Sequence, residues 1–185
     1  KFNSNIVKKI LNDIKNDGDR ALLKYEKKLG KNSIIVSNPK KVRKQIDALD
    51  LKVKKSLDLA YSRIFEFHSK QKVRNIFYKD KLQNRLSYKF IPIESIGIYV
   101  PGGTASYPST VLMNAIPAII AGVKRIVMVN PNNNNEQNSG VLYAAKKCGI
   151  KEIYSIGGAQ AIAALAYGTN KIKKVNKIVG PGNLY

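Results

Sequence analysis

The second half of the chain alternates short apolar runs with segments in which apolar residues recur at helical spacing. The apolar runs cover residues 96–100, 125–130, 152–156 and 175–179. The segments with helical spacing cover about 109–121, 140–148 and 159–167. Strands buried on both faces of a parallel sheet have such uninterrupted apolar sequences, and short connections imply right-handed crossovers. We therefore predict a β-α-β-α-β-α-β order and an α/β fold with a Rossmann-like, doubly wound parallel sheet.

The first ninety residues have a different pattern, which is typical of amphipathic helices. Ser4 and Asp19 are candidate N-caps, and Pro39 suits a first helical turn. Gly18 and Gly30 are candidate helix ends. The predicted helices cover about 4–18, 19–30, 39–49 and 51–72, with a short extended piece at 33–36 and a strand or hairpin arm at 86–93. The chain is thus predicted to divide into a helical N-terminal region, residues 1–90, and a sheet region, residues 91–185.

Three glycine turns directly follow predicted strands. They are Pro101-Gly102-Gly103-Thr104, Gly157-Gly158-Ala159-Gln160 and Gly180-Pro181-Gly182-Asn183. An open α/β sheet binds its ligand at the carboxyl ends of its strands, where helix N-termini offer N–H groups to an anion. Four polar side chains belong to this predicted edge: Tyr99, Thr104, Gln160 and Asn183.

The glycine turns alone do not decide between a nucleotide site and a purely structural role. None of them is a G-x-G-x-x-G, and the second strand ends in Asn130 instead of an acid that would hold a ribose. In the structural alternative, the glycines only allow tight turns from strand to helix.

Groups suited to catalysis are scarce. The chain has one histidine, His68, and one cysteine, Cys148, which is too few for a metal site built on these residue types. The carboxylates of the sheet region (Glu94, Glu136 and Glu152) show no paired spacing. The single cysteine cannot form an internal disulfide, which fits a reducing, cytoplasmic setting. The pattern therefore indicates a binding edge without a reaction centre.

The net charge of +21 raises the question of a nucleic-acid partner. Residues 1–90 carry 24 basic and 9 acidic residues, and residues 91–185 carry 9 and 3. A basic nucleotide- or nucleic-acid-binding module remains an alternative. We favour compositional bias, because the cations are mixed with acids and abundant Lys, Asn, Ile and Tyr accompany them. No apolar run approaches the roughly 20 residues of a membrane span, and we see no signal peptide, so no membrane partner is expected.

Several motifs in order resemble the histidinol dehydrogenase family. They are Gly97-Ile-Tyr-Val-Pro-Gly-Gly-Thr104, Pro108-Ser-Thr-Val-Leu-Met113, Pro117-Ala-Ile-Ile-Ala-Gly122, Gly157-Gly-Ala-Gln-Ala-Ile-Ala-Ala164 and Lys177-Ile-Val-Gly-Pro-Gly-Asn183. A weaker similarity, Phe67-His68 with Gln71, extends the resemblance toward the N-terminus. The resemblance implies a cytoplasmic, homodimeric, zinc-dependent enzyme. It would oxidise L-histidinol to L-histidine through the aldehyde, in the last steps of histidine biosynthesis, with two NAD⁺.

Motif by motif, the resemblance implies that Tyr99, Gln160 and Asn183 contact NAD. It also implies that residues 91–185 form the NAD-contacting domain, truncated at its C-terminal end. The family's zinc ligands, its proton-transfer pair and its other substrate contacts would follow Tyr185. We therefore expect an N-terminal fragment with no catalytic and no metal-binding residues, inactive alone. A third hypothesis is an interaction piece, whose apolar surface would make it prone to aggregation.

Overall fold

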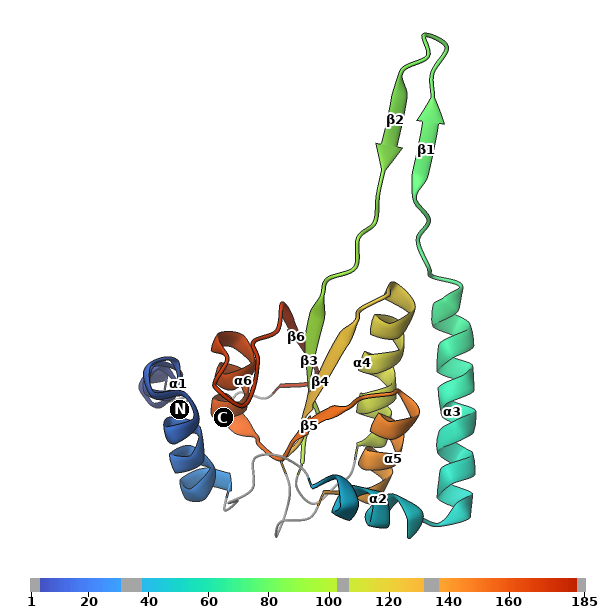
Figure 1. Cartoon of the computed structure of the whole chain (residues 1–185). Helices are drawn as coiled ribbons and strands as arrows, with labels where there is room; N and C mark the ends of the chain where they lie inside the picture. Colours follow the sequence, from blue (N-terminus) through green and yellow to red (C-terminus); the bar gives the residue numbers. More distant parts are fainter. Residues whose placement is uncertain (1–3, 31–37, 103–106, 132–136, 183–185) are drawn as a thin grey trace.

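The computed structural model describes residues 4–30, 38–102, 107–131 and 137–182 (Figure 1). Its central element is a four-stranded sheet in the order β5-β4-β3-β6, in which every neighbouring pair is parallel. Counted along the chain, this is the order 3-2-1-4 of a Rossmann half-fold. The predicted fold class is therefore confirmed. The strands are β3 (Ser95–Tyr99), β4 (Arg125–Val129), β5 (Glu152–Tyr154) and β6 (Lys177–Val179).

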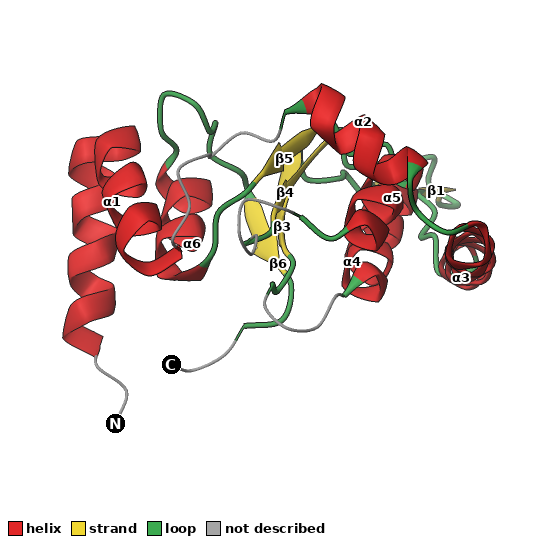
Figure 2. Cartoon of the chain, turned by 90° about the horizontal axis from the view of Figure 1, so that it is seen from below, coloured by secondary structure: helices red, strands yellow, loops and turns green. Residues whose placement is uncertain are grey.

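Helices cover both faces of this sheet (Figure 2). One face packs against α4 and α5, and the other packs against α6. The connections from β3 to β4 and from β4 to β5 run in one direction across the sheet, so right-handed crossovers place α4 and α5 on the same face. The connection from β5 to β6 runs in the opposite direction, which places α6 on the other face. The predicted sheet-region helices are thus confirmed, and each begins one residue earlier than predicted. Their bounds are α4 (Pro108–Ala121), α5 (Ser139–Lys147) and α6 (Gly158–Tyr167).

The helices of the first ninety residues pack onto the outer sides of the sheet helices. Buried Ile14 and Leu22 share a core with Leu165, and Leu57 and Ile64 pack against the core on the other face. The division of the chain near residue 90 stays a prediction. The helices are α1 (Ser4–Tyr25), a π-helical turn η1 (Glu26–Gly30), α2 (Pro39–Asp47) and α3 (Leu51–Ser69).

The predicted interruption at Gly18 is present inside α1. Gly18 has φ 51° and ψ −123°, which are not helical angles, so two helical segments meet there at a kink. Asn38 and Asp50 cap α2 and α3 by accepting hydrogen bonds from backbone N–H groups. The predicted extended piece at 33–36 lies outside the described residues.

A two-stranded antiparallel hairpin extends well beyond the rest of the molecule (Figure 1). Its strands are β1 (Ile76–Lys79) and β2 (Arg85–Tyr88). The arm predicted at 86–93 is therefore present, although the strand within it ends at Tyr88, and β1 was not predicted. Asp80 builds the tip, because its carboxylate accepts from the backbone N–H groups of Leu82 and Asn84 at 2.8 Å. No helix among the described residues is long and apolar enough to span a bilayer.

Candidate functional site

The turns that follow β3, β4, β5 and β6 meet at one edge of the sheet, because all four strands are parallel. A Cβ atom added at Gly157 would lie 2.6 Å from Cβ of Pro131. A Cβ atom at Gly180 would overlap the backbone carbonyl of Tyr99. At these positions the glycines serve close packing between neighbouring turns, as the structural alternative requires.

Tyr99 connects the first turn to the second. It is the last residue of β3, it is half-buried, and its hydroxyl accepts a hydrogen bond of 3.2 Å from the N–H of Gly158. Since Gly158 begins α6, the phenol lies against the N-terminus of that helix.

Gln160 is buried behind this edge and bonds to a residue that sequence reasoning missed. Its side chain is 3% exposed, and Nε2 donates to Oε1 of Glu26 at 2.9 Å. The same oxygen accepts from the N–H of Gly157 at 3.2 Å. Glu26 is only 1% exposed. Its carboxylate therefore lies at the N-terminus of α6, where the helix dipole favours a negative charge.

Nothing local in the sequence distinguishes Glu26 from the surface acids around it. It follows Tyr25 in the turn η1 and meets Gln160 across 134 positions of the chain. Only the packing of α1 on α6 brings the two side chains together.

Asn130 takes a structural role at the end of β4. Its Nδ2 donates to the carbonyl oxygens of Val100 at 3.0 Å and Pro101 at 3.2 Å, and the residue is 3% exposed. This amide ties the β4 end to the first glycine turn and is directed away from solvent.

Two of the predicted polar residues, Thr104 and Asn183, lie outside the described residues. The described part of the third turn is open. A Cβ atom added at Gly182 would meet no atom of the described residues within 4 Å. The structure thus brings Tyr99 and Gln160 to one edge, and the role of Tyr99, Gln160 and Asn183 toward a cofactor stays a prediction.

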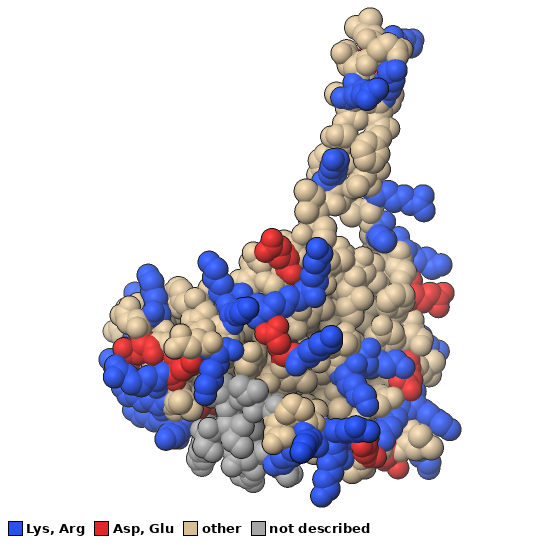
Figure 3. All heavy atoms as spheres, viewed as in Figure 1, with Lys and Arg blue, Asp and Glu red and all other residues tan. Residues whose placement is uncertain are grey.

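Basic side chains are spread over the body and along the hairpin on the face shown in Figure 3, with acids between them. No single cationic patch dominates that face. The origin of the net charge stays a prediction.

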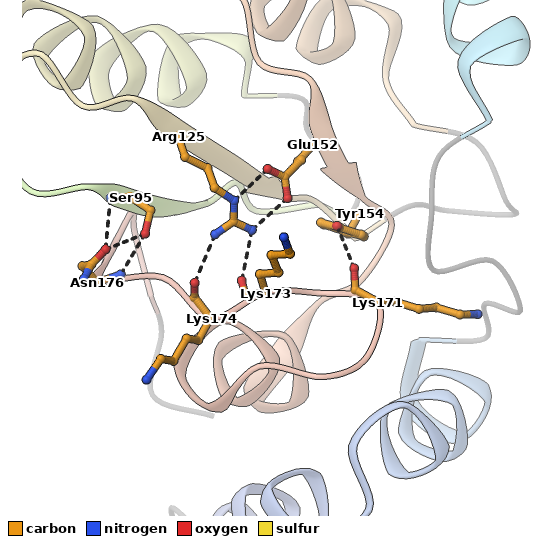
Figure 4. A network of polar contacts seen from close by, with 8 residues as sticks. All are labelled: Ser95, Arg125, Glu152, Tyr154, Lys171, Lys173, Lys174 and Asn176. Carbon is orange, nitrogen blue, oxygen red and sulfur yellow. Dashed lines mark hydrogen bonds and ion pairs between the residues drawn. The ribbon is translucent and has the colours of Figure 1, made fainter.

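A second polar cluster lies at the opposite, N-terminal edge of the sheet (Figure 4). Arg125 forms two hydrogen bonds with Glu152, of 2.7 and 2.8 Å. It also donates to the carbonyl oxygens of Lys173 and Lys174, both at 3.1 Å. The guanidinium therefore clamps the loop that leads from α6 into β6, which makes this cluster a structural one.

The Glu152→Gln substitution tests this clamp, because the contribution of the ion pair to the free energy of unfolding depends on pH. The hydrogen bond from Arg125 is the main cause that lowers the pKa of Glu152. A glutamate carboxyl in the unfolded chain has a pKa of about 4.3. The Arg125–Glu152 ion pair therefore stabilises the fold above that pH, and this contribution is lost as the pH falls through the lowered pKa of Glu152 in the folded protein. Since both side chains are partly exposed, we expect the wild type to be about 1 kcal/mol more stable near neutral pH.

Urea unfolding of both proteins as a function of pH measures this effect. The difference should shrink as the pH falls below the ordinary range of a glutamate and through the lowered pKa of Glu152. A difference that stays constant over this range would show that the ion pair does not carry it.

His68 and Cys148 are not placed to act together. Nδ1 of His68 lies 2.6 Å from Oε1 of Gln71 on the exposed end of α3. Cys148 is buried at the end of α5, and burial raises the pKa of its thiol to about 12, so it stays a thiol at neutral pH. Among the residues that the structure describes, no three His, Cys, Asp or Glu residues form a group that could hold a metal ion.

Comparisons with known proteins identify the family. The family model described as Histidinol dehydrogenase matches residues 2–185. Histidinol dehydrogenase of Pelagibacter ubique is 66% identical over 184 residues, which cover 100% of this chain and 43% of that protein. The enzyme of Carboxydothermus hydrogenoformans is 48% identical over 183 residues, covering 97% of this chain and 43% of that protein.

A solved structure agrees with the sequence matches. The crystal structure of histidinol dehydrogenase from Elizabethkingia anophelis superposes with a TM-score of 0.93 at 39% identity, covering 98% of this chain and 43% of that one. The chain therefore spans less than half the length of these relatives. Because the family model matches residues 2–185 and the motifs and the fold agree with it, this chain belongs to the histidinol dehydrogenase family.

Proposed function

We propose that this chain is the cofactor-binding portion of an oxidoreductase of histidine biosynthesis, which oxidises L-histidinol to L-histidine through the aldehyde. The observation that supports the proposal is that Tyr99 lies at the carboxyl edge of a parallel sheet, against the start of α6, which also carries Gln160. Such an edge is where α/β folds bind dinucleotides. We further propose NAD as the cofactor, and a cytoplasmic homodimer as the working form of the full-length protein.

The topology favours one crevice for NAD. The strand order reverses between β3 and β6, so the switch point lies beside Tyr99 and the third glycine turn. The first N–H groups of α6 already donate to Glu26 and Tyr99. We therefore propose that NAD lies along the turns of β3 and β6, against the Tyr99 ring, while a pyrophosphate at α6 would have to displace Glu26.

Within this proposal, the described residues bind and orient but do not react. Bound NAD⁺ would supply the acceptor for a hydride from the carbon that bears the alcohol. The Tyr99 ring offers a stacking surface and a hydroxyl, and Gln160 holds the Gly157 turn through Glu26. Asn183 completes the proposed set of contacts. The described residues do not fit zinc, so we propose that its ligands belong to the rest of the family's length and that this chain alone is inactive.

Titration of the chain with NAD⁺ by calorimetry tests the proposal. We expect measurable binding that weakens about tenfold in Tyr99→Ala, because loss of an aromatic contact of about 1.4 kcal/mol corresponds to that factor. Tyr167→Ala is the matched control, since that ring lies at the far end of α6 and is 45% exposed. Equal weakening in both variants, or no binding by the wild type, would contradict the proposed site.

The prediction of inactivity has its own measurement. With L-histidinol, zinc and NAD⁺ present, the chain should produce no NADH above the rate without protein. Sustained NADH formation would show that its reaction centre lies within these 185 residues.

A further inference from the structure

We propose that Glu26 is a positioning residue for the cofactor: it holds the turn at Gly157 and Gly158, and this turn holds the Tyr99 phenol. The inference rests on the proposed function, because it gives a residue of the N-terminal helices a role in the proposed NAD crevice. Glu26 is only 1% exposed, so it acts through its neighbours and offers no surface of its own to a ligand.

The first contact joins Glu26 to the start of α6. Its Oε1 accepts from the N–H of Gly157 at 3.2 Å and from Nε2 of Gln160 at 2.9 Å. Gly157 is the N-cap of this helix, and Gln160 is its third residue. One buried oxygen therefore connects the two ends of the first helical turn. Because both donors would be unsatisfied without it, the turn depends on this carboxylate for its position.

The carboxylate also fixes the direction in which the Gln160 amide faces. An ionised carboxylate only accepts hydrogen bonds, so the NH₂ group must face Glu26 and the carbonyl oxygen lies on the other side. A Cβ atom added at Gly158 would lie 2.8 Å from that oxygen. Gly158 has φ +60°, a left-handed conformation that glycine adopts readily. The amide thus packs closely on this glycine and limits its movement.

The last contact joins the turn to Tyr99. The N–H of Gly158 donates to the Tyr99 hydroxyl oxygen at 3.2 Å. Tyr99 ends β3, whose backbone pairs with β4 on one side and β6 on the other. Its ring can therefore move only by rotation about its side-chain bonds, and the contact of the hydroxyl selects one orientation. Through Gly157 and Gly158, Glu26 decides where the phenol lies.

The N-terminal helices support Glu26 firmly. The hydroxyl of buried Tyr25 donates to a carboxylate oxygen of Asp13 at 2.6 Å. Asp13 precedes the kink at Gly18 and Tyr25 follows it, so this bond joins the two segments of α1. Glu26 then begins the π-helical turn η1, a rare element that is frequent at functional sites.

Packing alone does not account for a glutamate at this position. A buried carboxylate costs far more free energy than a buried apolar side chain, and apolar residues of similar volume often replace buried charges without loss of stability. The core around α1 and α6 is otherwise apolar, with Ile14, Leu22 and Leu165 fully buried in it. The hydrogen bonds of Glu26 to the turn therefore indicate a role in placing that turn.

The first experiment examines the chain without ligand. After incorporation of fluorotyrosine, the fluorine NMR signal of Tyr99 is identified by its loss in Tyr99→Phe. We expect Glu26→Ala to shift or broaden this signal, and Glu26→Gln, which keeps an acceptor oxygen, to leave it close to its original position. Ile172→Ala is the matched control, because Ile172 is buried in the same core beyond the opposite end of α6. Its loss destabilises the fold without touching the turn.

Calorimetric titration with NAD⁺ then tests the effect on binding. The Kd of Glu26→Ala should rise about tenfold, because a site that is competent for only a tenth of the time binds about tenfold more weakly. Glu26→Gln and Ile172→Ala should bind like the wild type. Since Glu26 acts through Tyr99, combining Glu26→Ala with Tyr99→Ala should weaken binding no further than Tyr99→Ala does alone. A purely structural role would not produce this non-additivity.

Three results would overturn the proposal: an unchanged Tyr99 signal in Glu26→Ala, an unchanged Kd, or losses that add in the double variant. Circular dichroism checks that each variant is folded. If Glu26→Ala is not, hydrogen exchange of the wild type decides instead. Saturating NAD⁺ should slow exchange at buried Gly157 more than at Ala144, which lies in α5 on the other face of the sheet, and equal slowing would reject the proposal.

Failure of this inference is distinct from failure of the proposed function. A wild type that does not bind NAD⁺ rejects the proposed function, and the role of Glu26 toward the cofactor with it. A wild type that binds NAD⁺ with the same Kd as Glu26→Ala rejects the role of Glu26 alone and leaves the cofactor site standing.

Discussion

Replacing Glu26 by alanine is expected to lower the free energy of unfolding by about 3 kcal/mol. The substitution removes the acceptor of two hydrogen bonds, from the N–H of Gly157 and from the amide of Gln160. Both donors stay buried, and an unsatisfied buried donor costs about 1–3 kcal/mol. The loss also removes a negative charge from the N-terminus of α6. Against a typical total of 5–15 kcal/mol, this is a large effect.

Denaturant unfolding measures the change, and two variants serve as controls. Glu26→Gln keeps an acceptor oxygen of the same shape, so it should retain most of the stability. Glu66→Ala removes an exposed glutamate from α3 and should change stability by less than about 0.5 kcal/mol. Hydrogen exchange at Gly157 should accelerate in Glu26→Ala alone. Equal stabilities of the alanine variant and the wild type would show that the carboxylate does not hold this turn.

The second large effect is expected from Gly180→Ala. Gly180 has φ +128°, a conformation that L-residues rarely adopt, and an added methyl would overlap the carbonyl of Tyr99. The obstacle is backbone, which cannot move aside as a flexible side chain can. Overpacking and an unfavourable backbone angle each cost about 1–3 kcal/mol, so we expect a loss of about 3 kcal/mol or more.

Gly182→Ala is the matched control for this prediction. Its added methyl, in the same turn, would meet no atom within 4 Å in the part of the chain that the structure describes, so stability should stay close to that of the wild type. Thermal unfolding of both variants distinguishes the sites. A Gly180→Ala protein as stable as Gly182→Ala would show that β6 is not pressed against Tyr99. If only Gly180→Ala also weakens NAD⁺ binding, the third turn contributes to the proposed crevice.

The fold was predictable because its signals are local. Short apolar runs followed by glycine turns indicate strands of a parallel sheet. The observed strand β4 lies within its predicted range, and β3 begins one residue earlier than predicted. The break at Gly18 and the helix at Pro39 followed from the conformations that these residue types allow. The strand β1 was missed because a short exposed strand has no buried face to impose alternation.

The candidate site was predictable only in part. The motifs located Tyr99 and Gln160, and parallel topology explains why both reach one edge. The same reasoning gave no hint that Glu26 would be buried beside Gln160. The turns also pack more closely than expected, since Gly157 and Gly180 face backbone or ring atoms of neighbouring turns.

The order of strands and helices, the glycine turns and the family could all be predicted from the amino-acid sequence, because each depends on short segments or on motifs in register. Which partners those segments meet became visible only in the folded chain. Folding buried Glu26 at the start of α6, directed Asn130 into the first turn and left one face of the hairpin uncovered. The contacts of Glu26 and Asn130 join residues far apart in the chain, and that of Glu26 forms only when α1 and η1 pack against α6.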